Sequence, residues 1–189
     1  GTGSYATYFA ADVLGCVAFG GGTFTSATSS IHFNADLTGS ASFAGVTSTA
    51  GGTGFAIRFL TLTGANVDIS GGSYTGATQT LWFSGAVDSA SSITIGGGIA
   101  VDSPTQQAVY FKSPMAGALD VTGGTFTAQS HAFYFHDLVE ATAKVTLGGA
   151  LTVDSTVGST ISALAVFAGA LSVTGGAFTA GEEGDFPYF

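Results

Sequence analysis

Positive charge is scarce in this sequence. Only three of its 189 residues are Lys or Arg, against twelve Asp and Glu, which gives a formal net charge of −9 at neutral pH. A chain with this charge repels phosphate backbones and anionic lipid surfaces. We therefore expect no nucleic-acid partner.

Cysteine, proline and long apolar runs are also rare or missing. The single cysteine, Cys16, has no partner for an internal disulfide, and its place at the start of an apolar strand predicts a small buried side chain. No uninterrupted run of about 18 apolar residues occurs, so no membrane-spanning helix is predicted. The chain opens without Met, and we interpret residues 1–189 as one domain in a processed or excised segment.

Glycine and phenylalanine are abundant, with 30 and 16 copies. Together with many Thr, Ser, Val and Ala residues they favour short strands joined by tight turns over helices. Eight phenylalanines recur at intervals of 22 to 32 residues, and each closes a short apolar run: Phe9, Phe33, Phe59, Phe83, Phe111, Phe135, Phe167 and Phe189. Recurrence of this kind indicates stacked copies of one structural unit.

The repeating unit is about 26 residues long, and two alternating versions make a 52-residue repeat. The segments 67–72, 119–124 and 171–176 begin 52 residues apart, and each alternates apolar and polar residues before two glycines. Alternation predicts a strand with one buried face, and the glycines predict a corner of unusual backbone geometry. A second short segment follows, and a third ends on the phenylalanine.

Three strands and three turns in each unit predict one coil of a parallel β-solenoid. Parallel crossovers are overwhelmingly right-handed, so we expect an all-β, right-handed parallel β-helix of about seven coils of 24–28 residues. Stacked coils place equivalent residues about 4.8 Å apart, which would pile the phenylalanines into an internal ladder. A β-sandwich also has many short strands, but it does not predict one residue type recurring at one phase.

The motif Gly-Gly-Thr-Phe-Thr, at 21–25 and 123–127, follows an apolar alternating strand and precedes an aromatic run. This pattern resembles the repeats of bacterial right-handed β-helix surface proteins, such as autotransporter passengers and polymorphic outer-membrane-type adhesins. The resemblance covers nearly the whole chain. It implies an extracellular or cell-surface, elongated module with an adhesive or structural role.

The middle residue of the third segment should point outward if its neighbours point inward. Read down the coils, this position forms an aromatic-rich stripe, which is either an ordinary exposed strand surface or a contact surface for a partner chain or sugar rings. The predicted binding residues are Tyr8, His32, Arg58, Trp82, Tyr110, Tyr134 and Tyr188, with Val166 interrupting the stripe.

A second aromatic series, Phe24, Tyr74, Phe126 and Phe178, follows the glycine corner in alternate coils. The sequence leaves open whether these rings face inward or outward. Thr-x-Thr pairs beside them are typical of ice-binding solenoids, but we expect Ile99/Val101 and Leu151/Val153 to break that lattice.

Several carboxylates recur at the same position of the repeat, and a pair of them could in principle catalyse glycoside hydrolysis or polysaccharide cleavage. Asp68 with Asp120, and Asp88 with Glu140, recur two coils apart, which is about 9.6 Å and the upper edge of the range for inverting glycosidases. Repetition of the unit explains this spacing without catalysis. His131 and the 136–137 pair fit a solvated turn. We predict no catalytic residue, no metal site and no cofactor.

The open strand edges of a solenoid favour further stacking, so a filament or surface layer is one expected assembly. Pro187 and Glu182 near the last strand would oppose it. The sequence therefore predicts a non-enzymatic, secreted structural or adhesive β-solenoid whose partners are other copies, other surface proteins or glycans. The alternative is a carbohydrate-binding or polysaccharide-cleaving β-helix.

Overall fold

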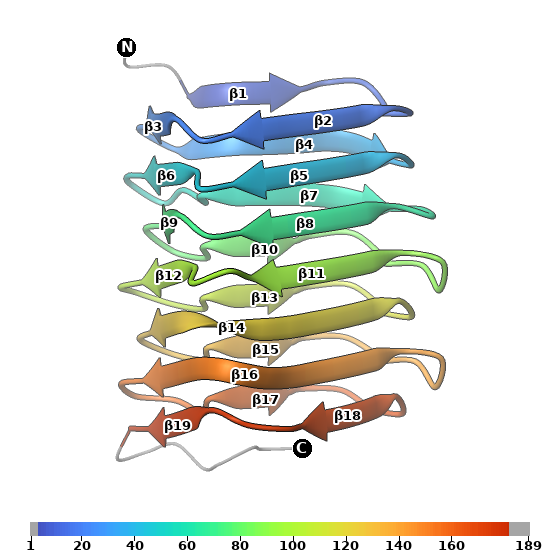
Figure 1. Cartoon of the computed structure of the whole chain (residues 1–189), viewed down its shortest axis with the longest axis vertical. Coiled ribbons are helices and arrows are strands. Elements are labelled where there is room, and N and C mark those ends of the chain that lie inside the picture. The colour runs from blue at the N-terminus through green and yellow to red at the C-terminus, as the bar shows by residue number, and fades with distance from the viewer. Residues whose placement is uncertain (1–3, 182–189) are drawn as a thin grey trace.

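The computed structural model describes residues 4–181. All regular structure in this range is β-strand, and the strands stack in seven coils that wind in a right-handed sense down one axis (Figure 1). All pairings between strands are parallel, as the repeat predicts. The described residues contain no helix of the length and hydropathy needed to cross a membrane.

One side of each coil is formed by a seven-stranded sheet. Its strands, in spatial order, are β1 (Tyr5–Phe9), β4 (Ser29–Leu37), β7 (Ile57–Leu62), β10 (Leu81–Phe83), β13 (Val109–Phe111), β15 (Phe133–Phe135) and β17 (Ile161–Ala163). Sequence order and spatial order are the same, because every coil adds one strand beside the strand of the coil before it.

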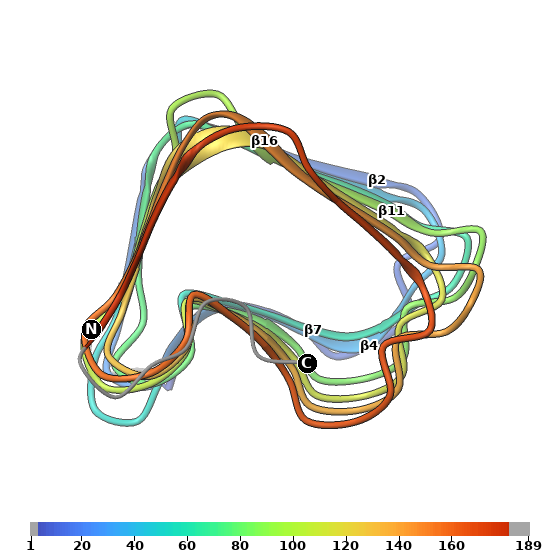
Figure 2. The same ribbon diagram turned by 90° about the horizontal axis from the view of Figure 1, so that it is seen from below.

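The other two sides of each coil belong to a larger sheet. The second side contains β2 (Cys16–Gly20), β5 (Ser40–Ala44), β8 (Asn66–Ser70), β11 (Ser92–Gly96) and β18 (Ala170–Val173). The third side contains β3 (Thr23–Ser26), β6 (Thr47–Ala50), β9 (Ser73–Thr75), β12 (Ala100–Ser103) and β19 (Ala177–Ala180). Two long strands, β14 (Ala118–Ala128) and β16 (Lys144–Ser155), run through both sides. Seen along the axis, the coils superimpose as one closed outline (Figure 2).

Glycine corners separate the second side from the third. Gly71 and Gly72 have positive φ, as do most glycines at this corner in the other coils, and glycine adopts positive φ without a steric penalty. At Gly72, with φ of 84°, a Cβ would also collide with the backbone of Val46 in the preceding coil. The predicted role of these glycines is confirmed.

The core is an axial stack of phenylalanine rings. Phe33, Phe59, Phe83 and Phe111 are 1% exposed, and the centroids of neighbouring rings lie 4.9, 5.3 and 4.6 Å apart with interplanar angles of 17° or less. At about 25 cal/mol per Å² of apolar surface, each buried ring contributes a few kcal/mol to folding. The internal ladder is confirmed as far as Phe135.

The prediction was wrong at Phe167. Phe135 is in register with Ala163, so alanine occupies the ladder position of the next coil. Phe167 instead pairs with Val139 in a further inward column, built in the turns from isolated bridges, which the sequence analysis missed. Val139 and Phe167 each follow the ladder position of their coil by four residues, so the turn keeps its length and only the residue types at the two positions differ. Phe189 lies outside the described residues.

The second aromatic series faces inward. Tyr74 and Phe126 are fully buried and alternate down the third side with smaller residues such as Val101 and Val153. Alternation of large and small side chains fills the corner without overpacking. Val101, like Ile99, is buried, so the expectation that these residues break a surface threonine lattice was wrong. Two carboxylates break it, because Asp102 is in register with Thr127 and Thr127 with Asp154.

Cys16 was also predicted wrongly, because its side chain is exposed. The inward residues of β2 are Val17 and Phe19, which pack against the core. Cys16 therefore belongs to the outward set, in register with Ser40 of the next coil. The alternation in this strand begins one residue later than expected.

Candidate functional site

Six of the predicted binding residues form one straight column on the outer side of the seven-stranded sheet. Each is the register partner of the next, coil by coil, from the first coil to the sixth. We call this set the aromatic column: Tyr8, His32, Arg58, Trp82, Tyr110 and Tyr134. In the seventh coil the position is Ser162, so Val166 does not belong to it. Tyr188 lies outside the described residues.

The aromatic column is flanked on both sides by projecting turns. Figure 2 shows β4 and β7 set back between two groups of turns that extend further from the axis. Phe55, from one group, packs on Trp82 with 4.2 Å between centroids. His136, which follows the other end of the sheet, meets Tyr110 and Tyr134 edge-on at 6.2 and 6.0 Å. These contacts explain why Arg58, Trp82, Tyr110 and Tyr134 are half-buried although they point away from the core.

The centre of the aromatic column is cationic. The guanidinium carbon of Arg58 lies 4.3 Å from the Trp82 ring centroid, and the Nζ of Lys112 lies 5.9 Å from it. Both distances are within the range of cation–π attraction. The Arg58 Nε also donates a hydrogen bond to the Ser84 hydroxyl at 3.0 Å. Burial lowers the pKa of Arg58, but a guanidinium remains charged at neutral pH.

The first two coils contribute a closed aromatic cluster. His32 is 3% exposed and lies between Tyr5 and Tyr8, with ring centroids 5.1 and 5.3 Å away. Both of its ring nitrogens are buried and have no hydrogen-bond partner among the described residues. Burial, with a smaller contribution from the charge of Arg58, lowers its pKa from 6.5 to about 4. His32 is therefore neutral at pH 7.

The last two coils of the aromatic column carry phenol groups. Tyr110 and Tyr134 stack with 5.5 Å between centroids, and burial raises the pKa of both. Both hydroxyls are therefore protonated at neutral pH and can donate or accept a hydrogen bond. His131 stacks on Tyr134 at 4.9 Å and accepts a hydrogen bond from the Ser159 N–H. His131 was expected in a solvated turn, and sequence spacing gave no signal of this contact.

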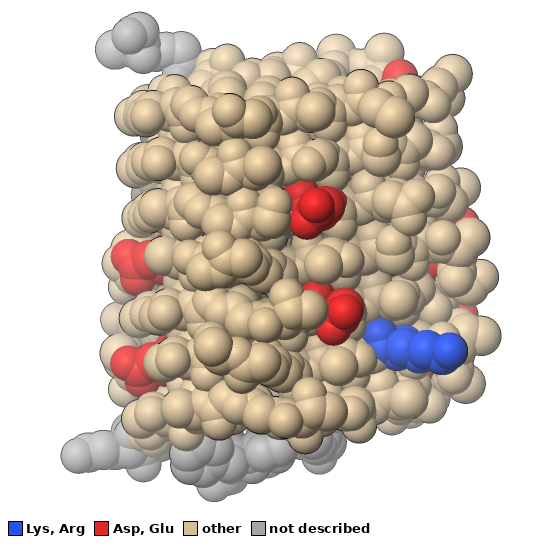
Figure 3. All heavy atoms as spheres, viewed as in Figure 1, with Lys and Arg blue, Asp and Glu red and all other residues tan. Residues whose placement is uncertain are grey.

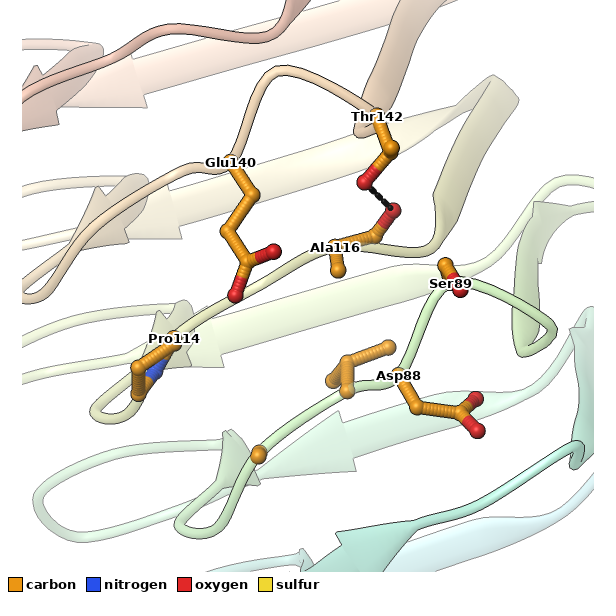
Figure 4. A pocket seen from close by; sticks show the side chains of 8 residues that line it. Asp88, Ser89, Pro114, Ala116, Glu140 and Thr142 are labelled. Atoms are coloured by element: carbon orange, nitrogen blue, oxygen red, sulfur yellow. Dashed lines mark hydrogen bonds between the residues drawn. The ribbon is translucent and has the colours of Figure 1, made fainter.

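A separate shallow pocket of about 370 Å³ lies over the turns that follow the seven-stranded sheet (Figure 4). Asp88 and Glu140 both line it, from coils two apart. Burial alone would raise the pKa of Asp88, but hydrogen bonds from the Ser91 hydroxyl and backbone N–H groups outweigh it and lower the pKa. The Asp88 carboxylate accepts from the Ser91 hydroxyl at 2.6 Å and from the Gly64 N–H at 2.9 Å, so it stabilises its own turn and joins it to the turn of the preceding coil.

Between residues 4 and 181, no three His, Cys, Asp or Glu side chains are grouped closely enough to hold a metal ion.

Comparisons with protein-family models, with curated protein sequences and with solved structures found no match for this chain. The parallel β-solenoid is therefore established by the strand pairing alone, and the adhesin resemblance remains a prediction.

Proposed function

We propose that this chain is a non-enzymatic adhesive module of a secreted or cell-surface protein, and that it binds its partner through the aromatic column. The observation that carries the proposal is the unbroken register of six large outward side chains, from Tyr8 to Tyr134. Tyr, Trp and Arg are the residue types that dominate binding energy at protein surfaces. A solenoid holds them on a rigid, evenly spaced backbone, so little ordering is needed on binding.

The geometry of the carboxylates supports the non-enzymatic part of the proposal. Asp68 and Asp120 occupy equivalent positions on the second side, with Thr94 between them in register. Asp88 is held in its turn by hydrogen bonds. These placements follow from repetition of the coil and from turn structure, and neither needs a catalytic role.

The test removes the two central rings of the aromatic column together. In the W82S/Y110S variant we expect at least tenfold weaker binding to cell surfaces, or loss of ordered polymers in electron micrographs, because both partly exposed rings are lost. A tenfold loss corresponds to about 1.4 kcal/mol.

The matched control is T125S/T152S, which changes two exposed residues in register on the third side. It should bind like the unmodified chain. W82S/Y110S loses the contacts with Phe55 and Tyr134 and should melt at a lower temperature, so binding is compared at a temperature at which circular dichroism shows both variants folded. Unchanged binding by W82S/Y110S would disprove the proposal. A positive reducing-sugar assay on polysaccharides would disprove its non-enzymatic part.

A further inference from the structure

Two of the three Lys and Arg residues of this protein meet at one point. Arg58 and Lys112 approach the same indole, that of Trp82, from the coils before and after it. Neither forms an ion pair with a carboxylate anywhere in residues 4–181. The remaining cation, Lys144, lies in β16 on the second side, which also carries acidic side chains (Figure 3). In a chain of net charge −9, two unpaired cations mark a place where an anion is favoured.

Ring orientation indicates how a ligand would be contacted. Trp82 and Tyr110 are nearly parallel, at 10°, and Tyr110 and Tyr134 are at 19°. Their faces are covered by one another, so edges and phenol hydroxyls are directed away from the sheet. The Trp82 Nε1 is buried without a hydrogen-bond partner in the described structure, and an indole N–H can only donate. The buried Trp82 N–H is closed to a ligand, so the donors that this surface offers to oxygen atoms are the hydroxyls of Tyr110 and Tyr134 and the two cations.

We propose that the aromatic column binds an acidic polysaccharide, with a uronate carboxylate between Arg58 and Lys112 and sugar hydroxyls at Tyr110 and Tyr134. This inference rests on the proposed function and names its ligand class. Six coils span about 24 Å at the spacing of parallel strands, so the ligand is an oligosaccharide rather than one sugar. Charge-assisted hydrogen bonds from Arg58 supply the strongest single contact.

An acidic peptide fits the same surface less well. Peptides that bind sheets add a strand at an exposed edge, whereas most of the aromatic column lies on the face of strands β4 to β15, which are paired on both sides. A helical peptide needs an apolar groove. Here the cations Arg58 and Lys112 lie beside the Tyr110 and Tyr134 hydroxyls, which suits a chain that carries both carboxylates and hydroxyls.

The experiment is calorimetric titration of the full chain with oligogalacturonides at neutral pH, beside their neutral methyl esters. We expect the acid form to bind and the methyl ester to bind at least tenfold more weakly. R58Q and K112Q should each weaken binding to the acid form about tenfold, which is about 1.4 kcal/mol. Added salt should weaken binding as well, because the charges are near the surface.

K144Q is the matched control, since it removes one cation from the second side; it should change affinity less than twofold. The proposal is overturned if oligogalacturonides do not bind at about 1 mM. Equal binding of acid and ester, or unchanged binding by both R58Q and K112Q, also overturns it. Poly-glutamate that binds while oligogalacturonides do not would assign the surface to acidic peptides.

The failure of this inference can be separated from failure of the proposed function. If W82S/Y110S loses cell-surface binding but no uronate binds, the aromatic column remains the binding surface and only the ligand class is wrong. If W82S/Y110S binds cells normally, the binding surface itself is wrong.

Discussion

The outward columns of the three sides share one backbone spacing but carry different chemistry. On the second side, register partners are small or acidic, as in Ser42, Asp68, Thr94 and Asp120. On the third side they are mostly threonine. On the seven-stranded sheet they are five aromatic or imidazole rings and an arginine. Strand pairing and core packing do not require large outward residues, and their confinement to one side is the observation on which the proposed binding role rests.

The largest expected effect tests the difference between inward and outward residues. In F83A, the stacked contacts with Phe59 and Phe111 are lost and a cavity remains, so we expect a loss of about 3–5 kcal/mol of stability. Thr127→Ala, at a partly exposed strand position on the third side, should cost less than about 1 kcal/mol. Urea denaturation measures both. Similar midpoints for the two variants would contradict the inward assignment of Phe83.

The glycine corners permit a narrower comparison. Gly72 and Gly98 have φ of 84° and 73°, but a Cβ at Gly72 would strike Val46 whereas Gly98 has open space around it. Gly98→Ala should therefore cost about 1 kcal/mol through backbone strain alone, and Gly72→Ala roughly 2–4 kcal/mol. The same denaturation assay separates them. A larger loss for Gly98→Ala would show that the coils do not approach as described.

The smallest expected effect is a pH dependence of stability that arises in the aromatic column. His32 has a pKa of about 4 when folded and about 6.5 when unfolded, so both states are neutral above pH 6.5. Between pH 6.5 and 4 the unfolded chain takes up the proton first, and stability falls as the pH falls. We expect a loss of about 1–2 kcal/mol by pH 4.5, after allowance for partial solvation.

His32→Phe provides the comparison, because a phenyl ring can fill the space between Tyr5 and Tyr8 and does not titrate. Urea midpoints of both proteins across this pH range isolate His32 from the carboxylates, which titrate in both. Parallel curves for the two proteins would show that His32 takes up its proton equally well in the folded chain.

Much of the fold could be predicted from the sequence because the sequence pattern of one coil repeats along the chain. Repetition makes the phase of residues such as Phe59 and Phe83 visible, and strand alternation then assigns their direction. Errors arose where residue types depart from the repeat. In the seventh coil Ala163 takes the ladder position and Phe167 lies four residues later, and Cys16 was assigned to the wrong side of its strand. A one-residue slip reverses the direction of a side chain in a strand.

The alignment of the residues in the aromatic column could be predicted from the sequence. The contacts that neighbouring turns make with that column could not. The aromatic column follows directly from the repeat, since Trp82 and Tyr110 occupy the same position in neighbouring coils. Contacts from turns, such as Phe55 with Trp82 and His131 with Tyr134, depend on turn conformations that differ among coils. The burial of His32 likewise depends on Tyr5, whose packing no spacing rule predicts.

The central claim is that one side of the solenoid binds and the other two do not. Hydroxyl-radical footprinting with and without an oligogalacturonide tests it most directly, with exposed Leu14 and Leu164 as internal references. We predict reduced labelling of Trp82, Tyr110 and Tyr134 in the presence of ligand and unchanged labelling of the two leucines. Unchanged labelling of the three rings, or protection confined to the second and third sides, would contradict the account.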